Sequence, residues 1–234
     1  MMQQTNVLDF GYVKLIEGWG SDESIIEAAR MSTDKGFNGW GTPEAPGDEK
    51  LLKYLYQNQH STPFEFGGLV LEIQAPIFVF REHQRHRTQS YAEMSARYTP
   101  LLDLNYVPTV ERLMINSKGS NKQAGTIPDA TELNEVGARY FQQDLERCYR
   151  DAQRSYELAL KNGIPKELAR LMLPVGRYSR MRAQANLRNW LGFLTLRMAE
   201  NAQWEIRQYA NVIGSYIESR FPKTWELFQL GRAA

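Results

Sequence analysis

The chain has 234 residues, with 28 Lys and Arg against 27 Asp and Glu and a formal net charge of +1. This balance argues against a general electrostatic binder of nucleic acid or membrane surfaces. The single cysteine excludes an intramolecular disulfide and any multi-cysteine zinc or iron–sulfur site. We expect one domain spanning residues 1–234, soluble and cytoplasmic, because 42% of the residues are hydrophobic and no apolar stretch approaches the roughly 20 residues that span a bilayer.

The first hundred residues predict three helices and one strand. Ser21 and Asp22 suit the start of a helix, and Pro76 suits the first position of another. That short helix would deliver Arg81 to Arg87 at its C-terminal end, where cations suit the helix dipole. The expected elements are a helix from Ser21 to about Met31, a loop over 36–47, a helix over 48–57, a strand over 64–73, a short helix from Pro76 and a loop over 85–98.

The second half predicts a long helix, a strand with one polar face, and a helical C-terminus. Residues 129–161 are amphipathic, and we expect their apolar stripe to pack on the core with Cys148 as a small core residue. Residues 177–186 alternate, which gives a strand whose polar face lines water or a ligand. The other expectations are an irregular stretch over 101–122 that is most mobile at 116–125, a short helix over 166–173, and two or three helices from Leu187 to Leu230, with Leu191, Leu194, Leu196, Ile206, Tyr209, Ile213 and Ile217 as their apolar residues.

The most polar stretch of the chain runs from Arg85 to Tyr98. It holds Arg85, His86, Arg87 and Arg97 together with two serines and Glu93, and it shows almost no apolar periodicity. Arginines at this density repel one another unless anions lie between them, and a guanidinium fork matches phosphate oxygens. The segment therefore predicts a site for phosphorylated ligands.

Other chemistries fit the sequence less well. His60, His83 and His86 lie close together, but the HExxH spacing of a zinc site is absent. Cys148 lacks an adjacent base, and Ser90 and Ser95 lack a GxSxG or SxxK context. No glycine-rich phosphate loop occurs, so a nucleotide here would be held by side-chain arginines.

Three arginines further along the chain could join such a site. They are Arg170, Arg188 and Arg197. For any one of them a surface ion pair is the ordinary interpretation, but Arg197 lies in an otherwise apolar helix, where burial would demand an anionic partner.

The chain resembles the flavin-dependent thymidylate synthases. Arg85-His86-Arg87, followed by seven residues and Ser95, is similar to the RHR-x7-S signature of that family. Further similar segments follow in the family's order: residues 60–65, Ala169-Arg170 with Leu173-Pro174, Asn186-Leu187-Arg188, and Leu196-Arg197 with residues 202–206.

The resemblance implies an α/β fold of the α+β type, with a mixed sheet flanked by long helices, in a homotetramer with shared active sites. It also implies FAD as cofactor and conversion of dUMP to dTMP, with methylenetetrahydrofolate as carbon donor and NADPH recharging the flavin. Metal and an enzymic cysteine nucleophile are not expected. Flavin contacts would come from His60, Thr62, Arg85, His86, Arg87, Glu93, Asn186 and Arg188; nucleotide contacts would come from Glu82, Arg85, Glu93, Ser95, Arg97, Arg170 and Arg197. Arg197 would be the catalytic residue that favours the ionised pyrimidine N3.

Three positions depart from the family pattern: Glu82, Ala92 and Gly192 stand where glutamine, asparagine and asparagine are common. A carboxylate at position 82 near a phosphate is unfavourable unless an arginine lies between them. Two alternatives therefore stay open. One is a homologue acting on another pyrimidine nucleotide such as UMP; the other is a non-catalytic nucleotide- or RNA-binding protein that stacks bases on Tyr91, Tyr98 and Tyr178.

Overall fold

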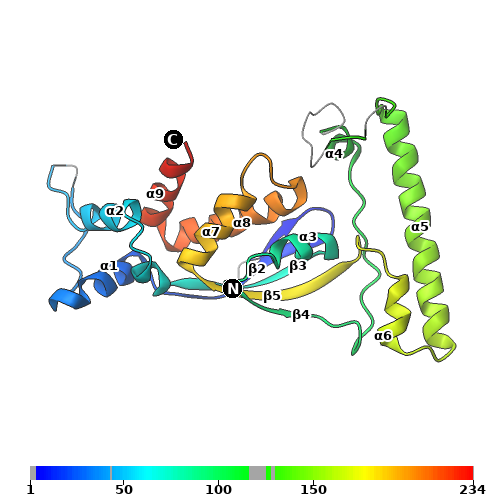
Figure 1. Cartoon of the computed structure of the whole chain (residues 1–234), viewed down its shortest axis with the longest axis horizontal. Coiled ribbons are helices and arrows are strands. Elements are labelled where there is room, and N and C mark those ends of the chain that lie inside the picture. Colours follow the sequence, from blue (N-terminus) through cyan, green and yellow to red (C-terminus); the bar gives the residue numbers. More distant parts are fainter. Residues whose placement is uncertain (1–3, 43, 116–124, 128–129, 234) are drawn as a thin grey trace.

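A computed structural model describes residues 4–42, 44–115, 125–127 and 130–233. Its centre is a five-stranded sheet in the order β1-β2-β3-β5-β4 (Figure 1). The strands are β1 (Gln4–Val7), β2 (Gly11–Trp19), β3 (Gly68–Pro76), β4 (Ser90–Glu93) and β5 (Tyr178–Asn186). All four pairings are antiparallel, so the expectation of a mixed sheet was wrong.

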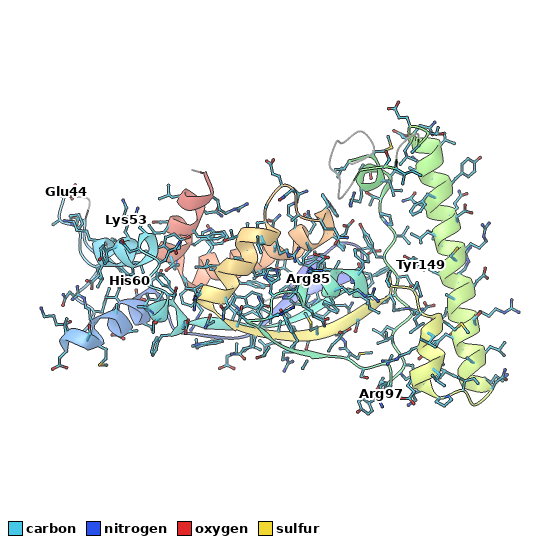
Figure 2. All side chains as sticks on the ribbon, viewed as in Figure 1. Glu44, Lys53, His60, Arg85, Arg97 and Tyr149 are labelled. Carbon is cyan, nitrogen blue, oxygen red and sulfur yellow. The ribbon has the colours of Figure 1, made fainter. Side chains whose placement is uncertain are left out.

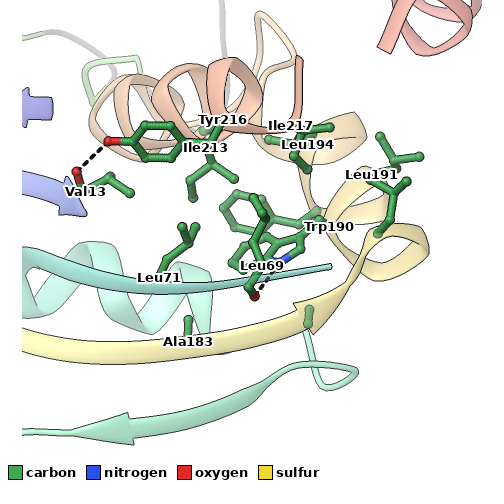
Figure 3. Close-up of a cluster of buried hydrophobic side chains, with 14 of the residues drawn as sticks. Val13, Leu69, Leu71, Ala183, Trp190, Leu191, Leu194, Ile213, Tyr216 and Ile217 are labelled. Carbon is green, nitrogen blue, oxygen red and sulfur yellow. Dashed lines mark hydrogen bonds between the residues drawn. The ribbon is translucent and has the colours of Figure 1, made fainter. Parts of the chain in front are cut away.

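One face of the sheet carries the core. Helices α7 (Leu187–Arg197) and α8 (Trp204–Arg220) lie over this face, where Val13, Leu71 and Ile213 are fully buried (Figures 1 and 3). Two polar contacts fix the layers: Trp190 Nε1 donates to Leu69 O at 3.1 Å, and the Tyr216 hydroxyl donates to Val13 O at 2.9 Å. The indole and phenol bury large apolar surfaces while their donors stay satisfied.

The alternation predicted for residues 177–186 is confirmed. In β5, Met181, Ala183 and Ala185 point into the core, and Arg180 and Arg182 are exposed on the other face. Tyr178 is the exception, because this side chain is buried at the start of the strand, with 2% of its surface exposed. A buried ring cannot stack on a base, which removes one of the three tyrosines invoked for RNA binding.

Two strand predictions need correction. The strand expected over 64–73 begins only at Gly68, because Thr62–Glu65 forms a 3-10 turn around Pro63. At Gly68 a Cβ would lie 2.3 Å from the Trp19 ring and 2.4 Å from Ala185 O, so the backbone can pair closely there only without a side chain. The loop expected over 85–98 contains β4, whose backbone pairs with β5 at the sheet edge.

The N-terminal helices form close to where they were expected. Ser21 Oγ accepts from Ser24 N at the start of α1 (Asp22–Arg30), and α2 (Glu49–Gln57) follows the predicted loop. A single 3-10 turn, Met31–Thr33, extends α1. Pro76 ends β3 and precedes α3 (Ile77–His83), and is therefore the N-cap of that helix and not its first residue.

Residues 101–122 were expected to be irregular, but they contain a short helix. Residues 110–115 form α4 (Val110–Ile115), and the mobile tip expected at 116–125 falls almost wholly outside the described residues. The long helix is α5 (Glu135–Lys161), whose N-cap Asn134 accepts from Gly137 N at 2.9 Å. Helix α6 (Lys166–Ala169) and the 3-10 turn Arg170–Met172 follow, and α9 (Pro222–Ala233) closes the chain after α8.

The apolar stripe of α5 does not pack on the core. Helices α5 and α6 stand at one end of the molecule, away from α7 and α8 (Figure 1). Phe141 is 48% exposed and Cys148 is exposed, so the expectation of a buried core cysteine was wrong. The amphipathic pattern predicts the apolar stripe of α5 but does not indicate which surface packs against it. Leu196, one of the apolar residues named for the C-terminal helices, is 61% exposed.

No helix in the described part of the chain is long and apolar enough to cross a bilayer.

Replacing Leu71 by alanine tests where the core lies. Leu71 is fully buried between the sheet and the helices, so Leu71→Ala should lower the free energy of unfolding by about 2–5 kcal/mol. Leu230 on α9 is 67% exposed, and Leu230→Ala should change stability by less than about 0.5 kcal/mol. Chemical denaturation of both variants measures the difference, and equal losses would contradict this placement of the core.

Candidate functional site

Two strand-to-helix connections position the site. Strand β3 runs directly into α3, and β5 runs directly into α7, where Asn186 Oδ1 caps the new helix by accepting from Asn189 N at 3.0 Å. Because β3 and β5 are antiparallel, Pro76 pairs with Tyr178 and Gly68 with Asn186, so the two helices start at opposite ends of the strand pair. Their C-terminal ends meet, which brings Glu82 and His86 to Arg197.

Arg197 is held by three contacts. Its Nη1 donates to Glu82 Oε2 at 2.8 Å, its Nη2 to Glu82 O at 3.0 Å, and its Nε to His86 Nε2 at 2.9 Å. The Arg197 side chain is 15% exposed and that of Glu82 36%. The carboxylate is thus the anionic partner that a largely buried arginine requires, and it accounts for an acidic residue at position 82. A guanidinium has five N–H groups, so two remain for a ligand.

His86 is neutral in this arrangement. Burial, and then the positive charge of Arg197, lower the pKa of His86 from 6.5 to about 4. Because Nε2 accepts from the arginine, the ring proton lies on Nδ1. His83, which is 1% exposed, has a pKa lowered to about 3, chiefly by burial.

The polar stretch from Arg85 to Tyr98 is anchored by side chains that the sequence pattern did not reveal. His83 Nε2 donates to Gln89 Oε1 at 3.1 Å, and the Tyr91 hydroxyl lies 2.9 Å from His86 O. The His83 and Phe193 rings are 4.5 Å apart, which ties the segment to α7. Burial raises the pKa of Tyr91 to about 12, so this hydroxyl stays a donor. Nothing in the local pattern distinguishes these core-like polar residues from ligand-binding ones.

A cavity of about 520 Å³ gathers part of the predicted nucleotide set. Ser95, Glu93 and Arg170 line it, together with Arg81 and Ser179, which were not predicted. Gln84 Nε2 donates to Glu93 Oε2 at 3.1 Å, and Ser95 Oγ accepts from Arg97 N at 3.3 Å. The Arg97 guanidinium lies outside the lining, 3.2 Å from Glu167 on α6.

A second cavity, of about 280 Å³, gathers part of the predicted flavin set. His60 and Arg188 line it with the apolar side chains of Leu55, Phe64 and Leu191. Arg188 Nη1 lies 2.7 Å from Glu65 Oε1, and the His60 ring lies edge-on to Tyr54 at 5.4 Å. Thr62 is exposed in the adjacent 3-10 turn. Apolar walls with a cation at the rim suit a planar ring that carries phosphates.

The predicted residues lie in three groups within one chain. His60, Arg85 and Arg97 are spread along the long axis of the molecule (Figure 2). Arg85 and Arg87 are exposed, and no hydrogen bond or ion pair holds either guanidinium among the described residues. A Cβ at Gly192 would meet nothing within 4 Å, so the asparagine common at this position would fit sterically.

The histidines that raised a metal hypothesis make other contacts in this geometry. The described residues contain no group of three or more His, Cys, Asp or Glu that could hold a metal ion. His83 and His86 contact Gln89 and Arg197 instead.

An α+β chain that surrounds its cavities with arginines, hydroxyls and apolar walls is of the class that holds phosphorylated, ring-bearing ligands. A family model described as "Thymidylate synthase complementing protein" matches residues 14–223. The flavin-dependent thymidylate synthase of Kosmotoga olearia is 37% identical over 96% of this chain and 93% of its own length. That of Thermus thermophilus is 36% identical over 95% of this chain and 77% of its own.

Among solved structures, a UMP/dUMP methylase, PolB, from Streptomyces cacaoi bound with 5-Br UMP aligns with a TM-score of 0.83 and 30% identity. The alignment covers 97% of each chain. The chain therefore belongs to the family of flavin-dependent thymidylate synthases.

The free energy of unfolding, measured below pH 6.5, tests whether His86 is neutral in the folded protein. Its pKa is lowered from 6.5 to about 4, so the unfolded chain binds more protons than the folded one below pH 6.5. The His86 contribution to the free energy of unfolding should therefore fall from about pH 6.5 towards pH 4. Denaturation of wild type and His86→Asn across this range should give a difference that shrinks as pH falls, and a constant difference would contradict the assignment.

Proposed function

We propose that the chain, as a single catalytic domain, converts dUMP to dTMP by reductive methylation. Methylenetetrahydrofolate would supply the carbon, reduced FAD the hydride, and NADPH the reducing equivalents that restore the flavin. The methylene carbon bonds to pyrimidine C5, the C5 proton leaves, and the hydride completes the methyl group as tetrahydrofolate departs. The observation that carries this proposal is Arg197, a largely buried cation with N–H groups to spare at the junction of α3 and α7.

The role of Arg197 follows from its charge. A cation beside a pyrimidine ring stabilises negative charge as N3 ionises, and this makes C5 a better nucleophile without covalent attack by the enzyme. Glu82 and His86 hold the guanidinium in place before the nucleotide binds, which lowers the cost of ordering it. Exposed Cys148 takes no part in this scheme.

The lining of the second cavity suits a planar ring such as that of the flavin. His60 and Arg188 would hold the flavin there, with Thr62 and Asn186 adjacent. The guanidinium groups of Arg85 and Arg87, which have no partner in the described part of the chain, would be available for its phosphates. FAD supplies the redox chemistry, and the protein aligns the planar rings and excludes water. Ser95, Glu93 and Arg170 would hold the nucleotide in the larger cavity, with Arg97 at its edge.

A homotetramer would complete the site. The predicted contacts lie in three separate groups along one chain, and an FAD molecule shared between copies would join them (Figure 2). The exposed apolar side chains of α5 and its neighbours, such as Tyr140 and Phe141, suit burial against another copy.

Transfer of deuteride from reduced flavin tests the reaction. With dUMP and methylenetetrahydrofolate, the product should carry deuterium in its methyl group. Arg197→Ala should slow single-turnover formation of dTMP by about 10² to 10³-fold, because it removes the cation at the ionising ring. Lys50→Gln, which removes an exposed cation on α2, is the matched control and should leave the rate unchanged. Wild-type protein that binds FAD but forms no methylated nucleotide would contradict the proposal.

UMP is the second candidate substrate. The structural neighbour with a TM-score of 0.83 is described as a UMP/dUMP methylase, and the same description accompanies its complex with 5-Br dUMP. The ratio of kcat/KM for the two nucleotides decides between them, and a value favouring UMP would shift the assignment to a ribonucleotide methylase.

A further inference from the structure

Two side chains without an assigned role line the 520 Å³ cavity. Arg81 comes from α3, one turn before Arg85, and Ser179 comes from the start of β5. The two elements are joined there, since Ile77 N donates to Arg177 O at 2.9 Å. The walls around them include Ser95, Arg170 and the apolar Leu173.

Arg81 is a cation without a partner among the described residues. Its side chain is exposed, and among the residues that the structure describes it makes no hydrogen bond or ion pair. Arg170 also lines the cavity, and its Nε donates to Glu167 O at 3.2 Å. Among the described lining residues Glu93 is the one carboxylate against two arginines, and an anion would neutralise the excess of positive charge.

Ser179 carries a buried hydroxyl that no described residue pairs with. The residue is 3% exposed, and its Oγ is buried with no hydrogen-bond partner in the described part of the chain. An unsatisfied buried hydroxyl is costly, and a ligand oxygen in the cavity would relieve that cost. Ser95, which also lines the cavity, accepts through Oγ from Arg97 N and keeps its own hydrogen to donate.

We propose that Arg81 and Ser179 bind the 5′-phosphate of the pyrimidine nucleotide in this cavity. Two guanidinium groups and two hydroxyls are the donor set that a phosphate dianion takes, and a guanidinium fork can contact two of its oxygens at once. The proposal rests on the proposed function and deepens it, by adding two residues to the nucleotide site. Arg81 is a substrate-binding residue for the phosphate and has no role at the flavin.

Binding of dUMP and of deoxyuridine to the FAD-loaded protein tests the proposal, because the two ligands differ only in the phosphate. Equilibrium dialysis should show that Arg81→Gln weakens dUMP binding by about 10- to 100-fold. Deoxyuridine binding should stay within about twofold of wild type. Arg81→Lys, which keeps the charge but not the fork, should give a smaller loss, and Lys50→Gln should give none.

Ser179→Ala should weaken dUMP binding by about 5- to 20-fold, again with deoxyuridine unaffected. Flavin absorbance and the melting temperature of each variant show whether it has folded. Arg81→Gln protein that binds dUMP as wild type does, or that loses deoxyuridine equally, would overturn the proposal while leaving the proposed function intact. Wild-type protein that binds neither dUMP nor UMP would overturn both.

Discussion

The antiparallel pairing of β3 with β5 is the constraint on which the rest of the molecule depends. Nine residues of each strand pair without interruption, and each strand leads directly into a helix. Since the strands run in opposite directions, the helices grow from opposite ends, and their C-terminal ends meet over the sheet. A slip of one residue in this register would turn Met181 and Ala183 outward and carry α7 away from α3. The contact of Arg197 with Glu82 is therefore a consequence of sheet register.

The arginines of the site are of two kinds, one largely buried and paired and the others exposed. Arg197 is held by a carboxylate and a neutral imidazole, whereas Arg81, Arg85 and Arg87 have no partner among the described residues. The first arrangement fixes a cation in one orientation. The second leaves cations free to meet the phosphates of incoming ligands, and near-neutral overall charge keeps this excess local.

The ion pair with Arg197 explains the glutamate at position 82, where glutamine is common in the family. A carboxylate there does not face an anion, because Arg197 lies against it. It also offsets part of the arginine charge that would act on a pyrimidine ring. The ion pair with Arg197 thus explains how Glu82 is tolerated. In this chain Glu82 has two opposite effects: it fixes the Arg197 side chain, and it reduces the positive charge that Arg197 would present to a pyrimidine ring.

The sequence predicted the helices and strands better than the sheet topology and the burial of side chains. The 2.0 period of β5, the N-cap at Ser21 and the C-terminal end of α5 at Lys161 are local properties, and each was confirmed. The start of α5 was not, because the helix begins at Glu135 and not near residue 129. The antiparallel sheet and the exposure of Cys148 depend on contacts between distant segments, which a single sequence does not display. The family segments pointed to Ser95 and Arg170, and both line the 520 Å³ cavity. They could not point to Ser179, because a serine on the core face of a strand looks like any other buried small residue.

The Arg197–Glu82 pair joins α3 to α7. A double-mutant cycle with Glu82→Gln, Arg197→Met and the double variant, read as the free energy of unfolding at pH 7, tests it most directly. Two groups in direct contact should show a coupling energy of about 0.5–3 kcal/mol. Effects that add to within about 0.3 kcal/mol would show that the two side chains do not interact, and would contradict this account of how the site is built.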